Sequence, residues 1–246
     1  MGRAVLRSIT VVVACLAVVV GVHDPFSRSF LSDAGAAAVS RSARESGTTL
    51  HVRIAHPLAI RRWPRAGRVI GWMPDSSRYY HQPIEAWVLR TALNGRYGRV
   101  PVPYAATHRQ GWIDLRGLKR TRTGVRVNVD LSRHLVVARR RGHVVLRTHA
   151  ATGSPVTPTP RGRYFVTDRV AFWRGSVYGS FAFGISGVQS HLPLGWSGGN
   201  QLAIHGTNEP WSIGRSVSAG CLRVSEKALR KLKLLLRLGT PVVISP

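Results

Sequence analysis

Proline and glycine interrupt the apolar sequence so often that long helices are excluded over most of the chain. Between residues 48 and 120, short apolar runs at 50–54, 68–72, 86–89 and 110–115 are separated by turn-forming residues. Runs of four to six residues bounded by Pro and Gly are typical of strands. This region is therefore predicted to be a small β-barrel or β-meander.

From residue 124 the pattern is one of strict alternation. Val125, Val127 and Val129 alternate with polar residues, and a second apolar run covers 135–138. A turn at Arg141 and Gly142 leads into a third run at 144–146, which predicts a hairpin. Residues 151–162 contain three prolines, which prevent ladder pairing, so a loop is expected there before a strand at 164–167.

One segment near the C-terminus has helical spacing. Ser225 can cap it, Glu226 lies in its first turn, and Gly239 is placed to end it. The apolar positions are Ala228, Leu229, Leu232, Leu235 and Leu236. With a closing strand at 242–244, the predicted fold is mainly β with one short C-terminal helix.

The 246-residue chain carries a formal net charge of +26, mostly from arginine. Such a charge implies a polyanionic neighbourhood: nucleic acid, anionic lipid or an anionic wall polymer. Because the arginines are spread along the whole chain and form no single stripe, a specific nucleic-acid groove is not expected.

The N-terminus predicts export. Arg3 and Arg7 precede an apolar run at 9–22 that contains no acid. Residues 1–25 are therefore interpreted as a signal peptide or an uncleaved signal anchor, and residues 26–47 as a linker. We expect the protein in the cell wall or periplasmic space, with membrane attachment if the N-terminal segment is retained.

Cys221 is the only cysteine outside the N-terminal segment, so no disulfide can form in the exported part. Taken alone it could be an inert buried thiol. It follows, however, a small-residue turn at 218–220, and His205 ends another apolar run. A cysteine nucleophile needs a base and backbone N–H donors for the oxyanion, and this pair of segments can supply both.

The sequence His205-Gly206-Thr207, a loop, and then 218–223 (Ser-Ala-Gly-Cys-Leu-Arg) resembles the active-site signature of the L,D-transpeptidase (YkuD) catalytic domain. The strand at 127–132 and the loop at 152–162 resemble further parts of that family, so the likeness covers 124–246. It implies a β-sandwich-like domain. Upstream, 87–90 (Trp-Val-Leu-Arg), Asn94-Gly95 and 111–114 (Gly-Trp-Ile-Asp) bear a weaker likeness to bacterial SH3-like wall modules. Residues 48–120 are therefore interpreted as a small SH3-like β domain, and a plain β domain fits equally well.

The resemblance implies a cysteine acyltransferase of peptidoglycan biosynthesis that uses no metal or cofactor. Cys221 would attack the carbonyl of the third stem-peptide residue, release D-alanine, and pass the acyl group to an acceptor amine. His205 would be the base and the Gly206 main chain would orient it. The remaining implied roles are oxyanion amides at Gly220 and Cys221, and substrate contacts from Arg223, Ser218, Thr207 and Asn208. Carbapenems should acylate Cys221.

One position departs from the family pattern, because Ala219 stands where many members have histidine, which puts the rate in question. Some polar and aromatic side chains could line the groove or simply pack nearby. These are Trp173, Tyr178, His191, Trp196, Asn200 and Trp211.

Three alternatives stay open. A carboxypeptidase on the same stems would use the same residues, with water as acceptor. A non-catalytic wall-binding protein would have an unreactive Cys221. A zinc site at His205 and Cys221 lacks the companion ligands of known zinc motifs. Anionic wall polymers are expected partners in each case.

Overall fold

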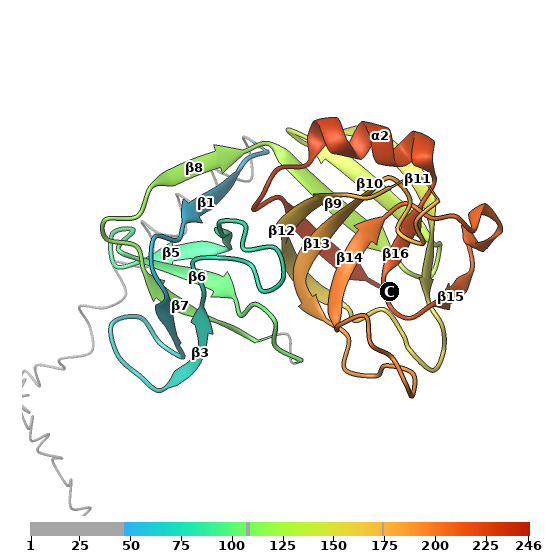
Figure 1. Ribbon diagram of the computed structural model, residues 1–246. Coiled ribbons are helices and arrows are strands. Elements are labelled where there is room, and N and C mark those ends of the chain that lie inside the picture. Colours follow the sequence, from blue (N-terminus) through green and yellow to red (C-terminus); the bar gives the residue numbers. More distant parts are fainter. Residues whose placement is uncertain (1–46, 107–108, 174) are drawn as a thin grey trace, which may run out of the picture.

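A computed structural model describes residues 47–106, 109–173 and 175–246 (Figure 1). The predicted signal or anchor, and the linker up to residue 46, lie outside these ranges. Strands β1–β8 gather on one side of the molecule, and β9–β17 with helix α2 form the other side (Figure 1). Within the described ranges, no helix has both the length and the apolar character needed to span a membrane.

The first half, which we call the upstream module, is built from eight short strands. They are β1 (Thr49–Arg53), β2 (Leu58–Arg61), β3 (Val69–Met73), β4 (Glu85–Val88), β5 (Arg90–Ala92), β6 (Tyr97–Pro101), β7 (Gln110–Asp114) and β8 (Arg120–Thr123). They form two sheets, ordered β4-β1-β8 and β3-β2-β7-β6-β5. Strands β2, β5, β6 and β8 fall outside the predicted runs. β8 (RTRT) contains no apolar side chain, so its pairing with β1 could not be detected from hydrophobicity.

The second half contains nine strands and the helix. They are β9 (Val125–Asp130), β10 (Leu135–Arg140), β11 (His143–Gly153), β12 (Gly162–Ala171), β13 (Phe181–Val188), β14 (Gln201–His205), a 3-10 turn η1 (Pro210–Ser212), β15 (Ser216–Ser218), β16 (Leu222–Val224), α2 (Glu226–Leu235) and β17 (Pro241–Ser245). The prediction of a mainly β fold with one short C-terminal helix is confirmed.

These strands follow the order β10-β9-β17-β12-β13-β14-β16-β11-β15, and β10 also pairs with β11, so the sheet returns on itself. Two long strands make this possible. β12 pairs with β17 through 162–165 and with β13 through 166–171, while β11 pairs with β10 and then with β16. The result is a two-layered sandwich whose layers share the strands β11 and β12.

Two predicted boundaries are wrong. β11 runs to Gly153, past the predicted loop start at 151, because Ala151 pairs with β16 and Thr152 with Ser216 of β15. Helix α2 begins as predicted, with the Ser225 hydroxyl accepting from the Ala228 amide. It ends at Leu235, before Gly239, because the backbone turns extended at Leu236 and buries that side chain.

Each half has its own hydrophobic core, and the outer face of β12 and β17 joins the two. Phe165 belongs to β12, yet it is fully buried within the core of the upstream module, and Val243 of β17 packs against the same cluster. The neighbouring residues Tyr164 and Val242 point into the other core. We call this contact between the halves the seam.

Candidate active site

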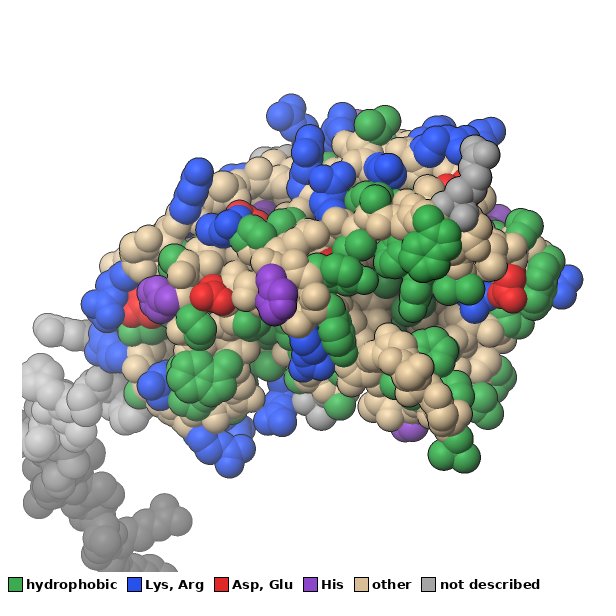
Figure 2. Space-filling view, in the orientation of Figure 1, with side chains coloured by type: hydrophobic (Ala, Val, Ile, Leu, Met, Phe, Trp, Pro, Cys, Tyr) green, Lys and Arg blue, Asp and Glu red, His purple; other side chains and the backbone are tan. Residues whose placement is uncertain are grey.

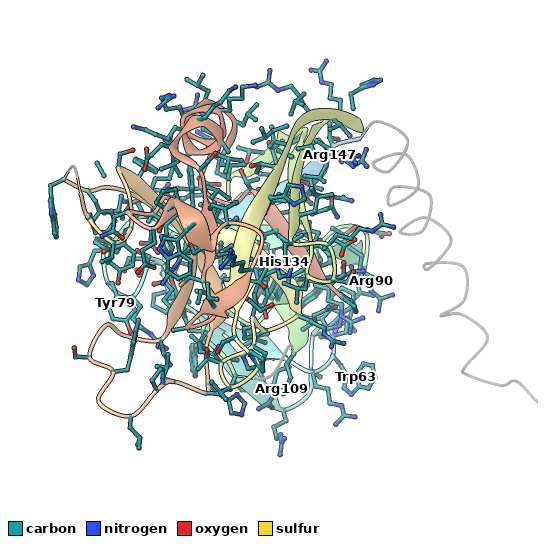
Figure 3. All side chains as sticks on the ribbon, turned by 90° about the vertical axis from the view of Figure 1, so that its right-hand side faces the viewer. Trp63, Tyr79, Arg90, Arg109, His134 and Arg147 are labelled. Atoms are coloured by element: carbon teal, nitrogen blue, oxygen red, sulfur yellow. The ribbon has the colours of Figure 1, made fainter. Side chains whose placement is uncertain are left out.

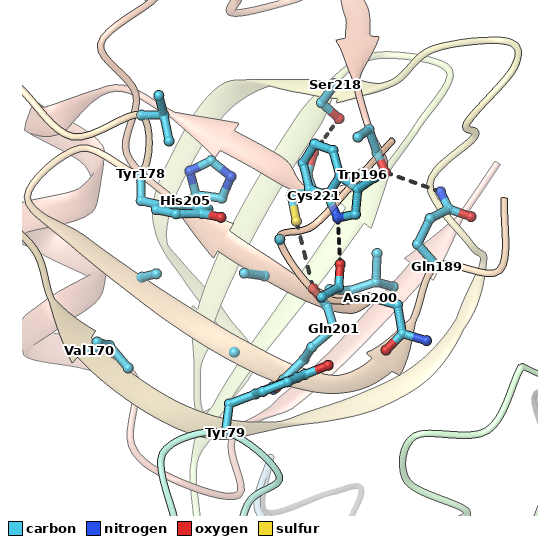
Figure 4. Close-up of a pocket in the computed structure, with 18 of the residues that line it drawn as sticks. Tyr79, Val170, Tyr178, Gln189, Trp196, Asn200, Gln201, His205, Ser218 and Cys221 are labelled. Atoms are coloured by element: carbon cyan, nitrogen blue, oxygen red, sulfur yellow. Dashed lines mark hydrogen bonds between the residues drawn. The ribbon is translucent and has the colours of Figure 1, made fainter. Parts of the chain in front are cut away.

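His205 and Cys221 are brought together by parallel strands. β14 pairs with β16 so that His205 lies opposite Arg223, and Cys221 directly precedes β16. Side chains alternate along a strand, so Cys221, Arg223 and His205 share the face opposite to the core residues Ile204 and Leu222. Figure 4 shows the thiol and the imidazole facing the same cavity.

The cavity has a volume of about 470 Å³ and a largely aromatic and polar lining. Among the residues that the structure describes, Arg223 is the only acidic or basic residue in that lining apart from His205. The aromatic members are Tyr79, Tyr80, Phe172, Tyr178 and Trp196, and the polar ones include Gln189, Asn200, Gln201 and Ser218.

The His205 imidazole is only 4% exposed. Its Nδ1 lies 2.5 Å from the Gly206 carbonyl, which can only accept, so the proton is assigned to Nδ1 and Nε2 keeps its lone pair. Burial lowers the pKa of His205 to about 4, with the Gly206 hydrogen bond acting in the opposite direction and Arg223 adding to the decrease. At neutral pH the ring is therefore neutral and able to take a proton.

The Cys221 thiol is half-buried, with Sγ 4.0 Å from the Gln201 carbonyl. Desolvation raises the pKa of Cys221, while the Ala203 backbone and the charge of Arg223 oppose the increase. A thiol with a raised pKa stays protonated at rest. It needs a neighbouring base to become a nucleophile.

The turn before the thiol is held by its own serine. The Ser218 hydroxyl donates to the Cys221 carbonyl at 2.6 Å and accepts from the Gly220 amide at 3.1 Å. Gly220 has φ +116, which side-chain-bearing residues rarely adopt. The amide predicted for the oxyanion thus has an internal partner in this structure.

The loop between β11 and β12 holds this turn in place through hydrogen bonds. The Thr157 and Thr159 hydroxyls donate to the Ser218 and Gly220 carbonyls at 2.9 and 2.8 Å. Gln189 donates to the Pro158 carbonyl at 2.9 Å and to the Ala219 carbonyl at 3.3 Å. The sequence marked 152–162 as a characteristic loop but did not show that its threonines hold the carbonyls around Cys221.

Arg223 forms an ion pair with Glu209, so its guanidinium ties β16 to the loop that follows His205. The Thr207 hydroxyl accepts from the Glu209 amide at 2.9 Å, and the Asn208 amide donates to the Gly175 carbonyl at 3.5 Å. Thr207 and Asn208 do not line the cavity. Glu209 is the only acid between His205 and Cys221, a signal that could have revealed this pairing.

One wall of the cavity comes from the upstream module. Tyr79 and Tyr80 line it, and the Arg78 guanidinium donates to the Asn200 side chain at 3.3 Å. Gln82 fixes the same loop by exchanging two hydrogen bonds with the Arg169 backbone, both at 3.0 Å. Sequence reasoning missed this wall because no local pattern indicates how two modules dock.

A buried carboxylate links this loop to the cysteine. Asp168 is fully buried and accepts hydrogen bonds from the Ser77 hydroxyl, from Thr167 at 2.7 Å and from the Gln201 side chain at 2.7 Å. The main-chain carbonyl of Gln201 is the one that faces the Cys221 sulfur. A continuous polar path therefore runs from the upstream module to the thiol.

The other candidates divide evenly. Tyr178, Trp196 and Asn200 line the cavity, and the Tyr178 ring meets His205 edge-on at 5.1 Å between centroids. Trp173, His191 and Trp211 are not in the lining. In the described ranges no group of three or more His, Cys, Asp or Glu side chains is arranged to hold a metal.

Comparison with known proteins relates the sequence of the second half to a protein family. The model of the L,D-transpeptidase catalytic domain, YkuD, matches residues 124–244. A Bacillus licheniformis protein, named as a candidate L,D-transpeptidase YkuD, is 31% identical over 121 residues, which are 49% of this chain and 66% of that protein. A Bacillus subtilis protein of the same name is 32% identical over 102 residues, 41% of this chain and 54% of that protein.

Among solved structures, an L,D-transpeptidase from Mycobacterium tuberculosis aligns with a TM-score of 0.41 and 18% identity, covering 85% of each chain. The chain spans about half to two thirds of the length of the two Bacillus relatives. The match to the family model identifies residues 124–244 as an L,D-transpeptidase catalytic domain of the YkuD family.

Proposed function

We propose that the protein is a peptidoglycan L,D-transpeptidase with Cys221 as its nucleophile and His205 as its general base. The observation that carries this proposal is the placement of the two side chains on one face of β14 and β16. There a neutral imidazole with a free Nε2 lone pair shares a cavity with a protonated thiol. Burial keeps both groups uncharged until a substrate carbonyl is in place.

In the first half-reaction, Nε2 of His205 takes the proton of the Cys221 thiol and the sulfur attacks the carbonyl carbon of the third stem residue. The bond to the terminal D-alanine breaks, and its nitrogen receives the proton from the imidazolium. A thioester remains. In the second half-reaction an acceptor amine attacks the thioester, His205 takes the amine proton, and the thiolate leaves and is reprotonated.

The oxyanion is assigned to the amides of Gly220 and Cys221. Because the Gly220 amide already donates to the Ser218 hydroxyl, we expect it to exchange that partner for the substrate oxygen. Gly206 orients His205 through its carbonyl. Arg223 acts as a positioning residue through its ion pair with Glu209, and its Nη2 side offers a second contact to a substrate carboxylate.

The proposal extends to the rest of the chain. Residues 1–25 export the protein or anchor it, so that the domain works in the cell wall or periplasmic space. Residues 48–120 act as an SH3-like β module that supplies Tyr79 and Tyr80 to the substrate cavity.

The test is the intact mass of the protein after incubation with a carbapenem, beside a Cys221→Ala variant. We expect an adduct equal to the whole carbapenem on the wild type alone, because the thiolate opens the lactam without losing atoms. No adduct on folded, reduced wild type, together with an untouched stem tetrapeptide, would favour a wall-binding protein.

Product analysis separates the two enzymatic alternatives. Tetrapeptide should be converted to a cross-linked dimer with release of D-alanine when an acceptor stem is present. Release of D-alanine with tripeptide as the only other product, even at high acceptor concentration, would identify a carboxypeptidase.

A further inference from the structure

A second cavity, of about 410 Å³, lies along the same seam. Its lining comes from β1, β4, β5 and β8 of the upstream module and from β9, β12 and β17 of the catalytic domain. Its described lining includes four arginines, Arg90, Arg122, Arg126 and Arg163, and no acid. Tyr79 of the catalytic cavity and Arg90 of this one lie toward opposite sides of the molecule (Figure 3). We call this second cavity the arginine cleft.

Strand register builds the floor of the cleft. Arg163 of β12 pairs with Val243 of β17, which pairs in turn with Asn128 of β9. Paired residues share a face of the sheet, and Arg126 lies two positions before Asn128 on that face. The catalytic domain thus presents two guanidiniums and an amide in a fixed row. Arg122 of β8, which is paired with Leu50, belongs to the same lining.

Among the described residues, no acid forms an ion pair with Arg90, Arg122 or Arg163. Arg90 is directly opposite Arg99 in the β5–β6 pair, an arrangement of like charges that destabilises a sheet. Desolvation lowers the pKa of Arg99, and the charges of Arg90 and Arg163 lower it further. The Nε atom of Arg99 is buried and has no hydrogen-bond partner among the described residues.

The described acids that form ion pairs do so with arginines other than those of the cleft. The ion pairs between described residues use Glu85, Asp114, Asp130 and Glu209, and none of these pairs involves Arg90, Arg99, Arg122 or Arg163. Basic side chains also cover the surface above α2 and around the upstream module (Figure 2). The arginine cleft differs from that diffuse charge because its guanidiniums line a concave site.

We propose that the arginine cleft binds the phosphate groups of a linear phosphodiester polymer of the cell wall. Guanidinium groups bind phosphate through paired hydrogen bonds, and Thr49, Thr91 and Asn128 add neutral donors to the same lining. Several arginines in one cleft call for a ligand that carries several charges close together. A chain of phosphodiesters meets that requirement.

The shape and lining argue against other phosphate ligands. A cavity of about 410 Å³ is too small to enclose a nucleic-acid duplex. Single-stranded nucleic acids are held by exposed aromatic rings on which bases stack. Trp87 is the one aromatic residue among the described residues of this lining, and it is buried. The polymer would hold the protein from one side of the seam while the catalytic cavity stays open on the other. This inference does not depend on the reaction at Cys221.

The experiment measures binding of inorganic tripolyphosphate and of a glycerol-phosphate oligomer to the full chain by titration calorimetry, across a series of salt concentrations. The test variant is Arg122→Ala/Arg163→Ala. The control is Arg147→Ala/Arg230→Ala, which removes the same charge from exposed positions on β11 and α2. Thermal unfolding establishes that each variant is folded.

We expect the test variant to bind both probes at least tenfold more weakly, with a plot of log K against log salt that is shallower by about 1 to 2. The control should stay within twofold of the wild type, and both variants should form the Cys221 adduct at the wild-type rate. If the test variant does not fold, Arg122→Lys/Arg163→Lys replaces it. Because lysine keeps the charge without the paired geometry, we expect that variant to lose affinity while the salt dependence is retained.

Equal losses in the test and control variants would overturn the proposal, since binding would then reflect net charge alone. Unchanged binding in the test variant would overturn it as well. The assignment to a single polymer chain would be overturned if duplex DNA, at the same phosphate concentration, competed with the oligomer as well as the oligomer itself does. The DNA would also have to lose the same affinity when Arg122 and Arg163 are replaced.

Discussion

The two cavities along the seam differ in the charge of their linings. The described lining of the catalytic cavity has one arginine, Arg223, which forms an ion pair with Glu209. The arginine cleft, in the part of the chain that the structure describes, has four arginines and no acid. A neutral thiol and a neutral imidazole require surroundings whose charge is balanced, because an uncompensated cation would keep the imidazole from accepting a proton. Chemistry and attraction to a polyanion are therefore separated on two sides of one interface.

The largest expected effect comes from His205→Gln. Removing the base should slow adduct formation at Cys221 by about 10² to 10⁴-fold, the usual contribution of a general base. Tripolyphosphate binding should not change. The matched control is His191→Gln, an exposed histidine outside the cavity lining. A rate for His205→Gln within threefold of the wild type would remove His205 from the mechanism.

Acid should weaken both halves of the molecule through one buried histidine in each. His51 of the upstream module and His205 both have a pKa lowered by burial from 6.5 to about 4. As pH falls below 6.5 the unfolded chain takes up protons that the folded chain cannot bind. Stability is thus complete above pH 6.5 and is lost between pH 6.5 and 4, by on the order of 3 kcal/mol per histidine.

Urea unfolding at pH 7 and pH 4.5 tests this, using His51→Gln and His205→Gln. Each variant should lose less stability on acidification than the wild type does. Only the His205 variant should lose adduct formation. An acid response identical in all three proteins would assign it to other groups.

A smaller effect is expected at the polar path between the module and the thiol. Ser77→Ala removes a donor to the buried Asp168 carboxylate and should lower the free energy of unfolding by about 1–3 kcal/mol. Ser76→Ala is the control, because the Ser76 hydroxyl donates to the neighbouring Asp75 at 3.2 Å and not to Asp168. Because Gln201 joins Asp168 to the main chain beside Cys221, adduct formation should also slow in Ser77→Ala and not in the control.

The smallest effect concerns the aromatic wall. Tyr79→Ala should raise KM for the stem tetrapeptide by roughly fivefold, equivalent to about 1 kcal/mol, with kcat nearly unchanged. Trp63→Ala, an exposed aromatic residue of the same module outside the cavity lining, should leave both constants alone. Equal effects of the two substitutions would mean that the module does not contact substrate.

Local patterns predicted much of this molecule. Alternating valines located β9, the Arg141-Gly142 turn located the β10–β11 hairpin, and Ser225 located the start of α2. Small-residue turns and the family resemblance singled out His205 and Cys221, which line one cavity. Each of these features depends on residues that are close together in the chain, so it can be predicted from the sequence alone.

Long-range partners could not be predicted in the same way. Thr159 bonds to a carbonyl 61 residues away, and Ser77 to a carboxylate 91 residues away. Both contacts exist only because strands and modules dock in a particular register. The arginine cleft is a similar case, since Arg90 and Arg163 are ordinary surface arginines until the seam brings them to one cavity.

Phe165 has a consequence for how such chains can be recombined. It lies within the stretch shared with the family, yet its side chain completes the core of the module that precedes that stretch. If the upstream module were exchanged for another, the new module would need an apolar pocket that fits the Phe165 ring. Without such a pocket this ring, which is now fully buried, would become exposed to water. The two modules are therefore expected to be inherited together, with the residues around Phe165 changing in concert.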